Sequence, residues 1–449
     1  AQNWEQVGDL NWSGPKIMYK DSTTGLLFVS CQSLMNGPDT INGIFTFDGV
    51  TIQPLAKQRY DCGNVDCGPT LFLTRYRDYI YYSGGMLLQI DSVPLRGIGR
   101  WDGQHWSAGL PGLGGNAFDQ SPFIDGHCIH EGKLYASGFF RTAEGDTCNS
   151  VAVWDGISWT SLNFPGQGFL SETPRVYHVF FFKGELYAAG NFYVFVDGEW
   201  VDDILRYDGA NWHAVGGGLK GGGANIWDWA IYKDELYVCG YFRKIDGNAG
   251  NKIMRWDGQQ WKDVGGGVCS PVEVTHGMTV HDGKLLLYGI FKCVGDGLPV
   301  NNIAAWDGER WCSFGNSTFD NTISRVAEYK GDIYIGGGFT EIDGQPVKYF
   351  AKWVGDHATD TCSAPISSAP EPKSEGCGLW PNPATDLLQV QAPTYIEALW
   401  VHDAQGREVL RPVVSGERVS LSVEHLPAGL YFVSLRAGGK IWGGKFVKM

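Results

Sequence analysis

The sequence predicts an all-β protein in two parts, a seven-bladed β-propeller followed by a small Ig-like β-sandwich. Three observations lead to this fold class. Glycine makes up 63 of the 449 residues, about twice the usual share of roughly 7%, and aromatic residues make up another 14%. A tripeptide of an aromatic residue, Asp and Gly recurs every 47–54 residues, and this repeat stops near residue 355. Repeats of this length that each hold several short strands are typical of propeller blades.

The repeated tripeptide sets the number of units at seven. A second Trp follows five residues later in most copies, and the seventh copy, Trp353-Val354-Gly355, is degenerate. Because Asp and Gly favour tight turns, the recurring Asp is predicted to order a turn and not to form a ring of carboxylates. The paired Trp residues are predicted to pack between blades. The six complete copies begin at Phe47, Trp101, Trp154, Tyr207, Trp256 and Trp306.

Each unit is expected to hold four antiparallel strands. In the sixth unit these are predicted at residues 274–281, 285–291, 303–306 and 310–314. The last unit lacks the outer Trp strand, and a matching segment, Asn3–Gly8, stands at the start of the chain. We therefore expect the strand around Trp4 to pair beside Trp353 and close the last blade, which removes an exposed sheet edge.

The composition changes after the repeats. Residues 356–378 are predicted to form a Pro/Ser-rich linker, and residues 379–449 contain alternating segments that predict a β-sandwich. The expected domains are therefore the propeller over 1–355, the linker, and the C-terminal domain over 379–449.

Four ordered motifs in this last part resemble the type A C-terminal sorting domain of the Bacteroidetes type IX secretion system. They are Pro381-Asn382-Pro383-Ala384-Thr385-Asp386, Asp403-Ala404-Gln405-Gly406-Arg407, Leu426-Pro427-Ala428-Gly429-Leu430-Tyr431-Phe432-Val433 and Lys445-Phe446-Val447-Lys448. The resemblance implies export through the outer-membrane translocon, removal of the domain by a sortase-like protease, and attachment of the cargo to surface lipopolysaccharide. Cleavage is then expected in the linker, in the region of Ser363, Ser374 and Gly376.

The resemblance implies a secreted or cell-surface location reached through the periplasm. A first residue Ala1 without a preceding Met is expected for a chain whose signal peptide has been removed. The repeats also resemble loosely defined secreted propellers of bacterial surface proteins that carry W-D-G repeats. That second resemblance specifies a fold and no activity.

Comparison among the repeats separates packing residues from candidate ligand-binding residues. His130 and His281 fall where other units carry Tyr or Phe, so both are predicted to pack. The beginnings of the first strands vary from unit to unit, and these strands line the central channel of a propeller. A varying set at that place is what a ligand site requires, although idle hydrated residues are the alternative. The set comprises His127, His178, Trp227, Asp228, Trp229, His276 and Arg325.

Other classes of site find little support in the sequence. No catalytic residue is predicted, because no H-E-x-x-H, P-loop or nucleophile-elbow motif occurs. No metal site is predicted, and Ca²⁺ is left open only for oxygen-rich loops at residues 144–146, 246–248, 296 and 343. A net charge of −14 argues against a nucleic acid partner. No apolar run reaches the roughly 18 residues of a transmembrane helix.

Eleven Cys favour an oxidising compartment, with Cys62–Cys67 and Cys362–Cys377 as possible pairs.

These features favour a cargo protein of the type IX secretion system, exported and anchored at the cell surface. The propeller is expected to act as a binding or structural module for a glycan, a protein or a surface. A propeller hydrolase or lyase acting on polysaccharide is the alternative, and enzymatic activity is left open. Asp228 is the one carboxylate nominated at the channel mouth, whereas hydrolysis of a glycosidic bond usually takes two.

Overall fold

The computed structural model divides the chain into two compact units, residues 1–365 and 366–449. It describes residues 3–8, 14–31, 43–60, 71–84, 87–95, 97–114, 122–165, 174–221, 225–269, 273–315, 317–355, 362, 378–380, 383–392, 394–403, 407–412, 414, 416–438 and 440–449. Regular structure in these ranges is almost entirely β, and the single helical turn among them is the 3₁₀ segment η1 (Lys244–Asp246). The all-β class predicted from the sequence is therefore confirmed.

Seven four-stranded antiparallel groups make up the first unit. Their first strands are β2 (Pro15–Asp21), β6 (Leu71–Tyr76), β13 (Phe123–His130), β19 (Arg175–Phe182), β23 (Asn225–Tyr232), β27 (Val274–His281) and β33 (Ile323–Tyr329). Their second strands are β3 (Leu26–Cys31), β7 (Tyr79–Gly84), β14 (Lys133–Phe139), β20 (Glu185–Val196), β24 (Glu235–Tyr241), β28 (Lys284–Ile290) and β34 (Asp332–Gly337).

The third strands carry the aromatic residue of each tripeptide at their ends. They are β4 (Gly43–Phe47), β10 (Ile98–Trp101), β17 (Val151–Trp154), β21 (Glu199–Tyr207), β25 (Ile253–Trp256), β31 (Ile303–Trp306) and β37 (Phe350–Trp353). The fourth strands are β5 (Ile52–Tyr60), β11 (Trp106–Ala108), β18 (Trp159–Ser161), β22 (Trp212–Ala214), β26 (Trp261–Asp263), β32 (Trp311–Ser313) and, for the last group, β1 (Trp4–Gln6). The four strands predicted for the sixth unit are thus found, with ends shifted by a residue at most.

Short strands join or extend the groups. The strands β8 (Leu87–Ile90) and β9 (Val93–Pro94) continue the first group beyond β5. The remaining short strands are β12 (Leu113–Gly114), β15 (Thr142–Ala143), β16 (Asp146–Thr147), β29 (Cys293–Val294), β30 (Leu298–Pro299), β35 (Glu341–Ile342) and β36 (Gln345–Pro346).

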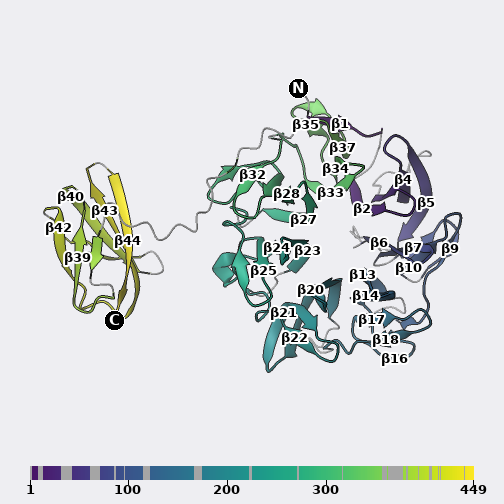
Figure 1. The fold of residues 1–449 in the computed structure, drawn as a ribbon, viewed down its shortest axis with the longest axis horizontal. Coiled ribbons are helices and arrows are strands. Elements are labelled where there is room, and N and C mark those ends of the chain that lie inside the picture. Colours follow the sequence, from purple (N-terminus) through teal and green to yellow (C-terminus); the bar gives the residue numbers. More distant parts are fainter. Residues whose placement is uncertain are drawn as a thin grey trace. The chain divides into compact units, whose positions relative to one another are not determined.

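The seven groups are arranged around a common centre (Figure 1). Their first strands contact one another in the order β2, β6, β13, β19, β23, β27, β33, and β33 contacts β2. The last group is completed by the start of the chain, because β1 pairs antiparallel with β37 and places Trp4 opposite Trp353. The two indole rings lie 4.9 Å apart. The predicted pairing of the N-terminal strand is therefore confirmed.

The tripeptide Asp orders a turn in all six complete copies. In the last of them, Asp307 Oδ1 accepts hydrogen bonds from the backbone N–H groups of Glu309 and Arg310, both at 2.8 Å. The same two bonds recur at the other five copies, Asp48, Asp102, Asp155, Asp208 and Asp257. These turns join the third and fourth strands, and in five of the six copies they bring two aromatic residues opposite one another, as at Trp306 and Trp311.

Neighbouring groups are joined by a repeated set of hydrogen bonds. The Tyr that ends a first strand donates its hydroxyl to a carbonyl in the first hairpin of the next group, as in Tyr232 to Gly283 at 2.7 Å. Tyr329 makes the equivalent bond to Gly25, which joins the last group to the first. His130 occupies this position in the third group and stacks on Phe181 at 3.7 Å. His281 occupies it in the sixth group, where its Nδ1 lies 2.9 Å from Glu328 Oε2 of the next group. Both histidines thus lie in contacts between groups.

The second unit consists of two sheets on one hydrophobic core. One sheet has the order β38 (Gly378–Trp380), β39 (Leu387–Gln391), β42 (Arg418–Ser422), and the other β41 (Glu408–Leu410), β40 (Ile396–Asp403), β43 (Gly429–Ala437), β44 (Lys440–Lys448). Leu388 and Leu421 of the first sheet share a buried cluster with Leu399, Leu435 and Phe446 of the second.

The disulfides differ from one expectation. Cys362 is bonded to Cys312 on β32 and not to Cys377, and a second disulfide joins Cys269 to Cys293. The reason is spatial: Cys362 also forms a bridge pair with Cys312 at the outer edge of the sixth group. Cys62, Cys67 and Cys377 lie outside the described residues, as does almost all of the predicted linker.

Candidate ligand-binding site

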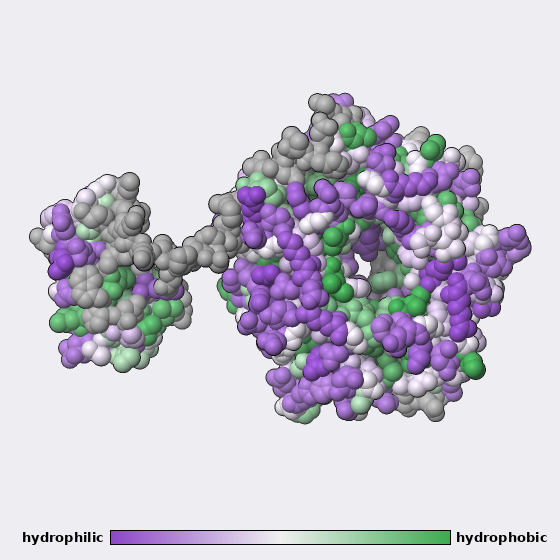
Figure 2. Space-filling view, in the orientation of Figure 1, coloured by the Kyte–Doolittle hydropathy of each residue, from purple (hydrophilic) through white to green (hydrophobic). Residues whose placement is uncertain are grey.

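The candidate residues lie at a β-bulge that recurs near the beginning of the first strands. In six of the seven first strands one residue is left over in the pairing with the second strand, as Trp227 is between Ile226 and Asp228. A bulge kinks the strand and redirects the neighbouring side chains. The bulged residues are Lys16, Asp125, Tyr177, Trp227, His276 and Ser324. The face shown in Figure 2 is hollowed at the centre of the ring, where hydrophobic residues form part of the rim.

Arg325 provides the positive charge that links several candidate residues. It follows the bulge of β33, and its Nη1 donates to the carbonyl of the adjacent Ser324 at 2.8 Å. Its charge further lowers the pKa of both His178 and His276, and it opposes the effect of burial on the pKa of Asp228. The structure therefore brings Arg325, Asp228, His178 and His276, from four different first strands, within electrostatic reach of one another.

The Asp228 carboxylate is held by backbone groups of two strands. Its Oδ1 accepts from the Trp229 N–H and its Oδ2 from the Met278 N–H, both at 2.9 Å. Burial raises the pKa of this carboxyl, while Arg325 and the two N–H groups oppose the rise. A Cβ on Gly277 would overlap Asp228 Oδ2, so this close approach requires glycine. With both oxygens engaged, Asp228 mainly fixes the geometry of the site.

The three histidines of the set are kept neutral near pH 7. Burial lowers the pKa of His127, His178 and His276 to about 4 in each case. His178 donates its Nε2–H to the Trp227 carbonyl at 3.1 Å, since a carbonyl only accepts. Neither ring nitrogen of His127 has a hydrogen-bond partner among the described residues.

The two tryptophans of the set lie in different surroundings. Trp227 retains 36% of its surface exposed, and its ring lies 6.0 Å from that of His276 in an edge-to-face arrangement. Trp229 stacks on Phe180 at 4.1 Å and packs on the core between the fourth and fifth groups. The structure thus places Trp229 among packing residues, whereas Trp227 stays available to a ligand.

Three residues near this set were missed by the sequence reasoning. The charge of Lys16 reaches His276 and lowers its pKa. Phe72 contacts the rings of His127 and His178 at 5.9 and 5.7 Å. The buried Tyr288 has its hydroxyl beside Gly277, next to Asp228. Lys16 could have been found by counting, because each bulged residue stands five positions before the last residue of its first strand.

The oxygen-rich loops considered for Ca²⁺ use their side chains within the protein. Asp246 forms an ion pair with Arg243, with N–O distances of 2.7 and 2.9 Å. Asp343 accepts from the Thr318 N–H at 2.7 Å. In the described parts of the chain no group of three or more His, Cys, Asp or Glu side chains is placed to hold a metal ion.

The motif residues of the second unit order its turns and its final strand. Arg407 forms an ion pair with Asp403, the last residue of β40, at 2.7 Å. Tyr431 stacks on Phe446 and donates its hydroxyl to the Pro427 carbonyl at 2.9 Å. Ala384, after Pro383, pairs with Lys448 on the last strand. The other motif residues take regular places, with Asp386 before β39, Gly429 and Leu430 opening β43, and Lys445 and Val447 on β44. Pro381, Asn382 and Gly406 lie outside the described residues.

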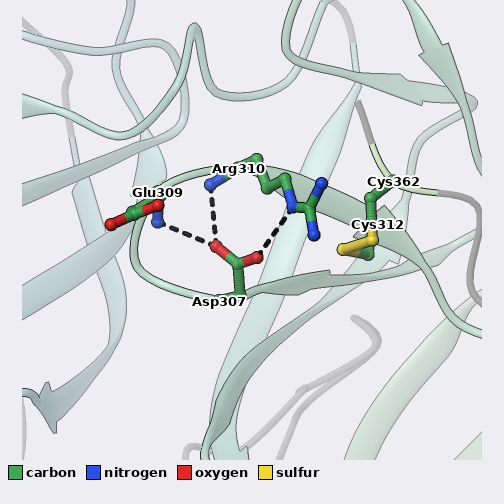
Figure 3. Close-up of a disulfide and its surroundings, with 5 residues drawn as sticks. All are labelled: Asp307, Glu309, Arg310, Cys312 and Cys362. Atoms are coloured by element: carbon green, nitrogen blue, oxygen red, sulfur yellow. Dashed lines mark hydrogen bonds and ion pairs between the residues drawn. A yellow bond between two sulfur atoms is a disulfide. The ribbon is translucent and has the colours of Figure 1, made fainter. Parts of the chain in front are cut away.

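The expected processing region begins directly after a disulfide. Figure 3 shows Cys362 bonded to Cys312, two residues after the Asp307–Arg310 turn that leads into β32. Ser363, Ser374 and Gly376 lie outside the described residues. The chain is therefore covalently fixed to the sixth group immediately before the predicted site of cleavage.

Comparison with known proteins identifies the second unit. Residues 378–449 match the family model of the secretion system C-terminal sorting domain. No curated protein matches the chain. Among solved structures, PorZ, described as an essential surface component of the type IX secretion system of Porphyromonas gingivalis, is 11% identical, with 94% of this chain and 69% of that chain covered and a TM-score of 0.27. YjhT is 12% identical, with coverages of 66% and 97% and a TM-score of 0.38. At these values neither likeness assigns a fold or a function.

The sorting domain marks the chain as cargo of the type IX secretion system, which is exported through the outer membrane to the surface or the medium. Among the described residues, no helix is long and apolar enough to span a membrane.

Proposed function

We propose that residues 1–355 form a seven-bladed β-propeller that serves as a surface-exposed binding module. The seven antiparallel groups, the circuit of contacts between their first strands and the pairing of β1 with β37 support this fold. The second unit, with its two sheets on one core, fits an Ig-like sandwich. It would engage the translocon, be removed by a sortase-like protease, and leave the propeller attached to surface lipopolysaccharide.

The ligand-binding site of the module is the channel mouth, which is formed by the residues at and directly after the bulges of the first strands. The observation that carries this proposal is that the bulge places chemically different side chains at one structural position of neighbouring strands. His178, Asp228 and Arg325 all follow the bulge directly, whereas Gly126 and Gly277 stand there in other groups. A repeat conserves within one chain what its fold needs, so variation at one register is typical of a site with a function of its own.

Binding is favoured over polysaccharide cleavage. A glycosidase of the usual kind has two carboxyl groups that flank the bond. At this mouth Asp228 has both oxygens bonded to backbone N–H groups, and Asp125 is held by Arg175 at 2.7 and 2.9 Å. Both carboxylates are thus engaged by groups of the protein itself, which favours a structural role for each.

The test is a screen of the full chain against glycans and surface polysaccharides by calorimetry, with product analysis in parallel. We expect binding without turnover, and we expect Trp227→Ala to abolish it. Trp200→Ala is the control, because Trp200 is similarly exposed at 43% but lies on β21, away from the bulges. Release of oligosaccharides that Trp227→Ala prevents would instead identify a hydrolase or lyase. Equal loss of binding in both variants would place the site elsewhere.

A further inference from the structure

Arg325 differs from the other arginines on first strands. Arg75 and Arg175 each make two hydrogen bonds to a carboxylate, Asp21 and Asp125 respectively, at 2.6–2.9 Å. Arg325 has no carboxylate within 4.0 Å among the described residues, and it donates a hydrogen bond to the backbone carbonyl of Ser324. A half-buried guanidinium with no carboxylate in hydrogen-bond contact can bind an anion, because its planar donors match a carboxylate or a sulfate.

Among the described residues, the charged groups that act on His178, Asp228 and His276 are the cations Arg325 and Lys16, although the whole chain carries −14. Lys16 lies near enough to act on His276 and likewise has no ion-pair partner in the described ranges. The carboxylate of Asp125 is neutralised by Arg175, and the three histidines are uncharged at neutral pH. Of these two cations, Arg325 acts on the Asp228 carboxyl, whose charge is already shared with two N–H groups. Arg325 and Lys16 together would therefore attract an anion.

The groups beside Arg325 suit a sugar. Trp227 offers a partly exposed indole that contacts the His276 ring, and its backbone carbonyl is held by His178. The apolar face of a pyranose ring packs on such a surface.

We propose that the channel mouth binds an anionic saccharide, with the acidic group on Arg325 and Lys16 and a sugar ring on Trp227. This inference rests on the proposed binding function and adds the class of ligand. Carboxylate-bearing sugars and sulfated sugars share the required chemistry, and the experiment distinguishes them.

The test measures binding of the full chain to three soluble polymers by calorimetry in low salt. They are polygalacturonate (carboxylate), dextran sulfate (sulfate ester) and dextran (neutral). We expect at least one of the two anionic polymers to bind 10-fold or more tightly than dextran. Arg325→Gln should weaken that binding roughly 10- to 100-fold, the range for loss of a hydrogen bond between charged groups. Lys16→Gln should weaken it several-fold.

Lys133→Gln is the control, because it removes one positive charge at the far end of the first hairpin of the third group and should leave affinity unchanged. Thermal melting of each variant shows that it is folded. If Lys133→Gln weakens binding as much as Arg325→Gln does, the effect is one of net charge and the inference is wrong. It is also wrong if dextran binds equally well or if no polyanion binds. In those cases the proposed function still stands wherever a neutral ligand binds and Trp227→Ala abolishes that binding.

Discussion

At the scale of single residues, the Asp of the aromatic-Asp-Gly tripeptide makes the same turn interaction in six groups of the first unit. Each of the six copies accepts two backbone hydrogen bonds, and in each the pKa of the carboxyl is lowered. At Asp307 burial alone would raise the pKa, but the N–H groups of Glu309 and Arg310 and the Arg310 guanidinium outweigh it. The ionised Asp carboxylate therefore stabilises the turn more than the protonated carboxyl does.

Replacing this Asp should destabilise the first unit. We expect Asp307→Ala to lower the free energy of unfolding by about 1–2 kcal/mol, as for loss of an N-cap oxygen, and Asp307→Asn to recover about half, because the amide oxygen still accepts. Chemical denaturation at pH 7 measures both. Since the folded pKa is below the unfolded value, the contribution is present above pH 4 and fades as the pH falls further. The Ala and wild-type proteins should therefore converge in stability below pH 3, and a constant difference would contradict this role.

At the scale of elements, β1 is the part on which the arrangement of the first unit depends. Trp4 is 1% exposed, and its ring contacts those of Trp353 and Phe319 at 4.9 and 6.0 Å. Its place matches that of Trp212, which pairs with Tyr207 in the fourth group. The difference is that Trp4 and its partner Trp353 stand at opposite ends of the repeat sequence, whereas Trp212 and Tyr207 are five residues apart.

Removing the Trp4 side chain should therefore loosen the pairing of β1 with β37 and open the ring of groups. We expect Trp4→Ala to cost about 3–5 kcal/mol, the usual range for deleting a buried Trp, and to make Trp353 accessible to a fluorescence quencher. Trp212→Ala should cost a similar amount without exposing the β37 edge. Deuterium exchange at β37 separates the two variants: it should rise in Trp4→Ala alone. Equal protection of β37 in both would show that closure does not depend on β1.

The repeat made these elements predictable, whereas the site was only partly so. The spacing of the tripeptides and the match between residues 3–8 and the fourth strands predicted the pairing of Trp4 with Trp353. The bulges were not foreseen, because they arise from strand pairing and not from a residue type. They show why Lys16, Trp227 and His276 share one structural position, the bulged residue of a first strand. The approach of Tyr288 to Asp228 depends on the missing side chain of Gly277, and the Cys312–Cys362 disulfide depends on where the chain returns after the last group.

At the scale of the whole molecule, the chain consists of two units that have separate hydrophobic cores. The core of the second unit draws only on residues between 384 and 446, apart from partly buried neighbours in the same unit. The cores of the first unit draw on residues up to 353, with Cys362 packed against the last of them. Each unit should therefore fold by itself, which suits the proposed removal of the sorting domain after export.

Ending the chain at residue 377 tests this division. The Cys312–Cys362 disulfide is retained and closes a loop that should stabilise the first unit by up to about 4 kcal/mol, so its melting temperature should match that of the full chain. Calorimetry should show the transition of the second unit to be missing.

In a host that carries a type IX system, the full chain should reach the cell surface or the medium, and the shortened chain should remain in the periplasm. Surface labelling of intact cells makes the distinction, and a matched Cys312→Ser/Cys362→Ser chain with the sorting domain intact should still be exported. Export of the shortened chain would show that the first unit carries an address of its own.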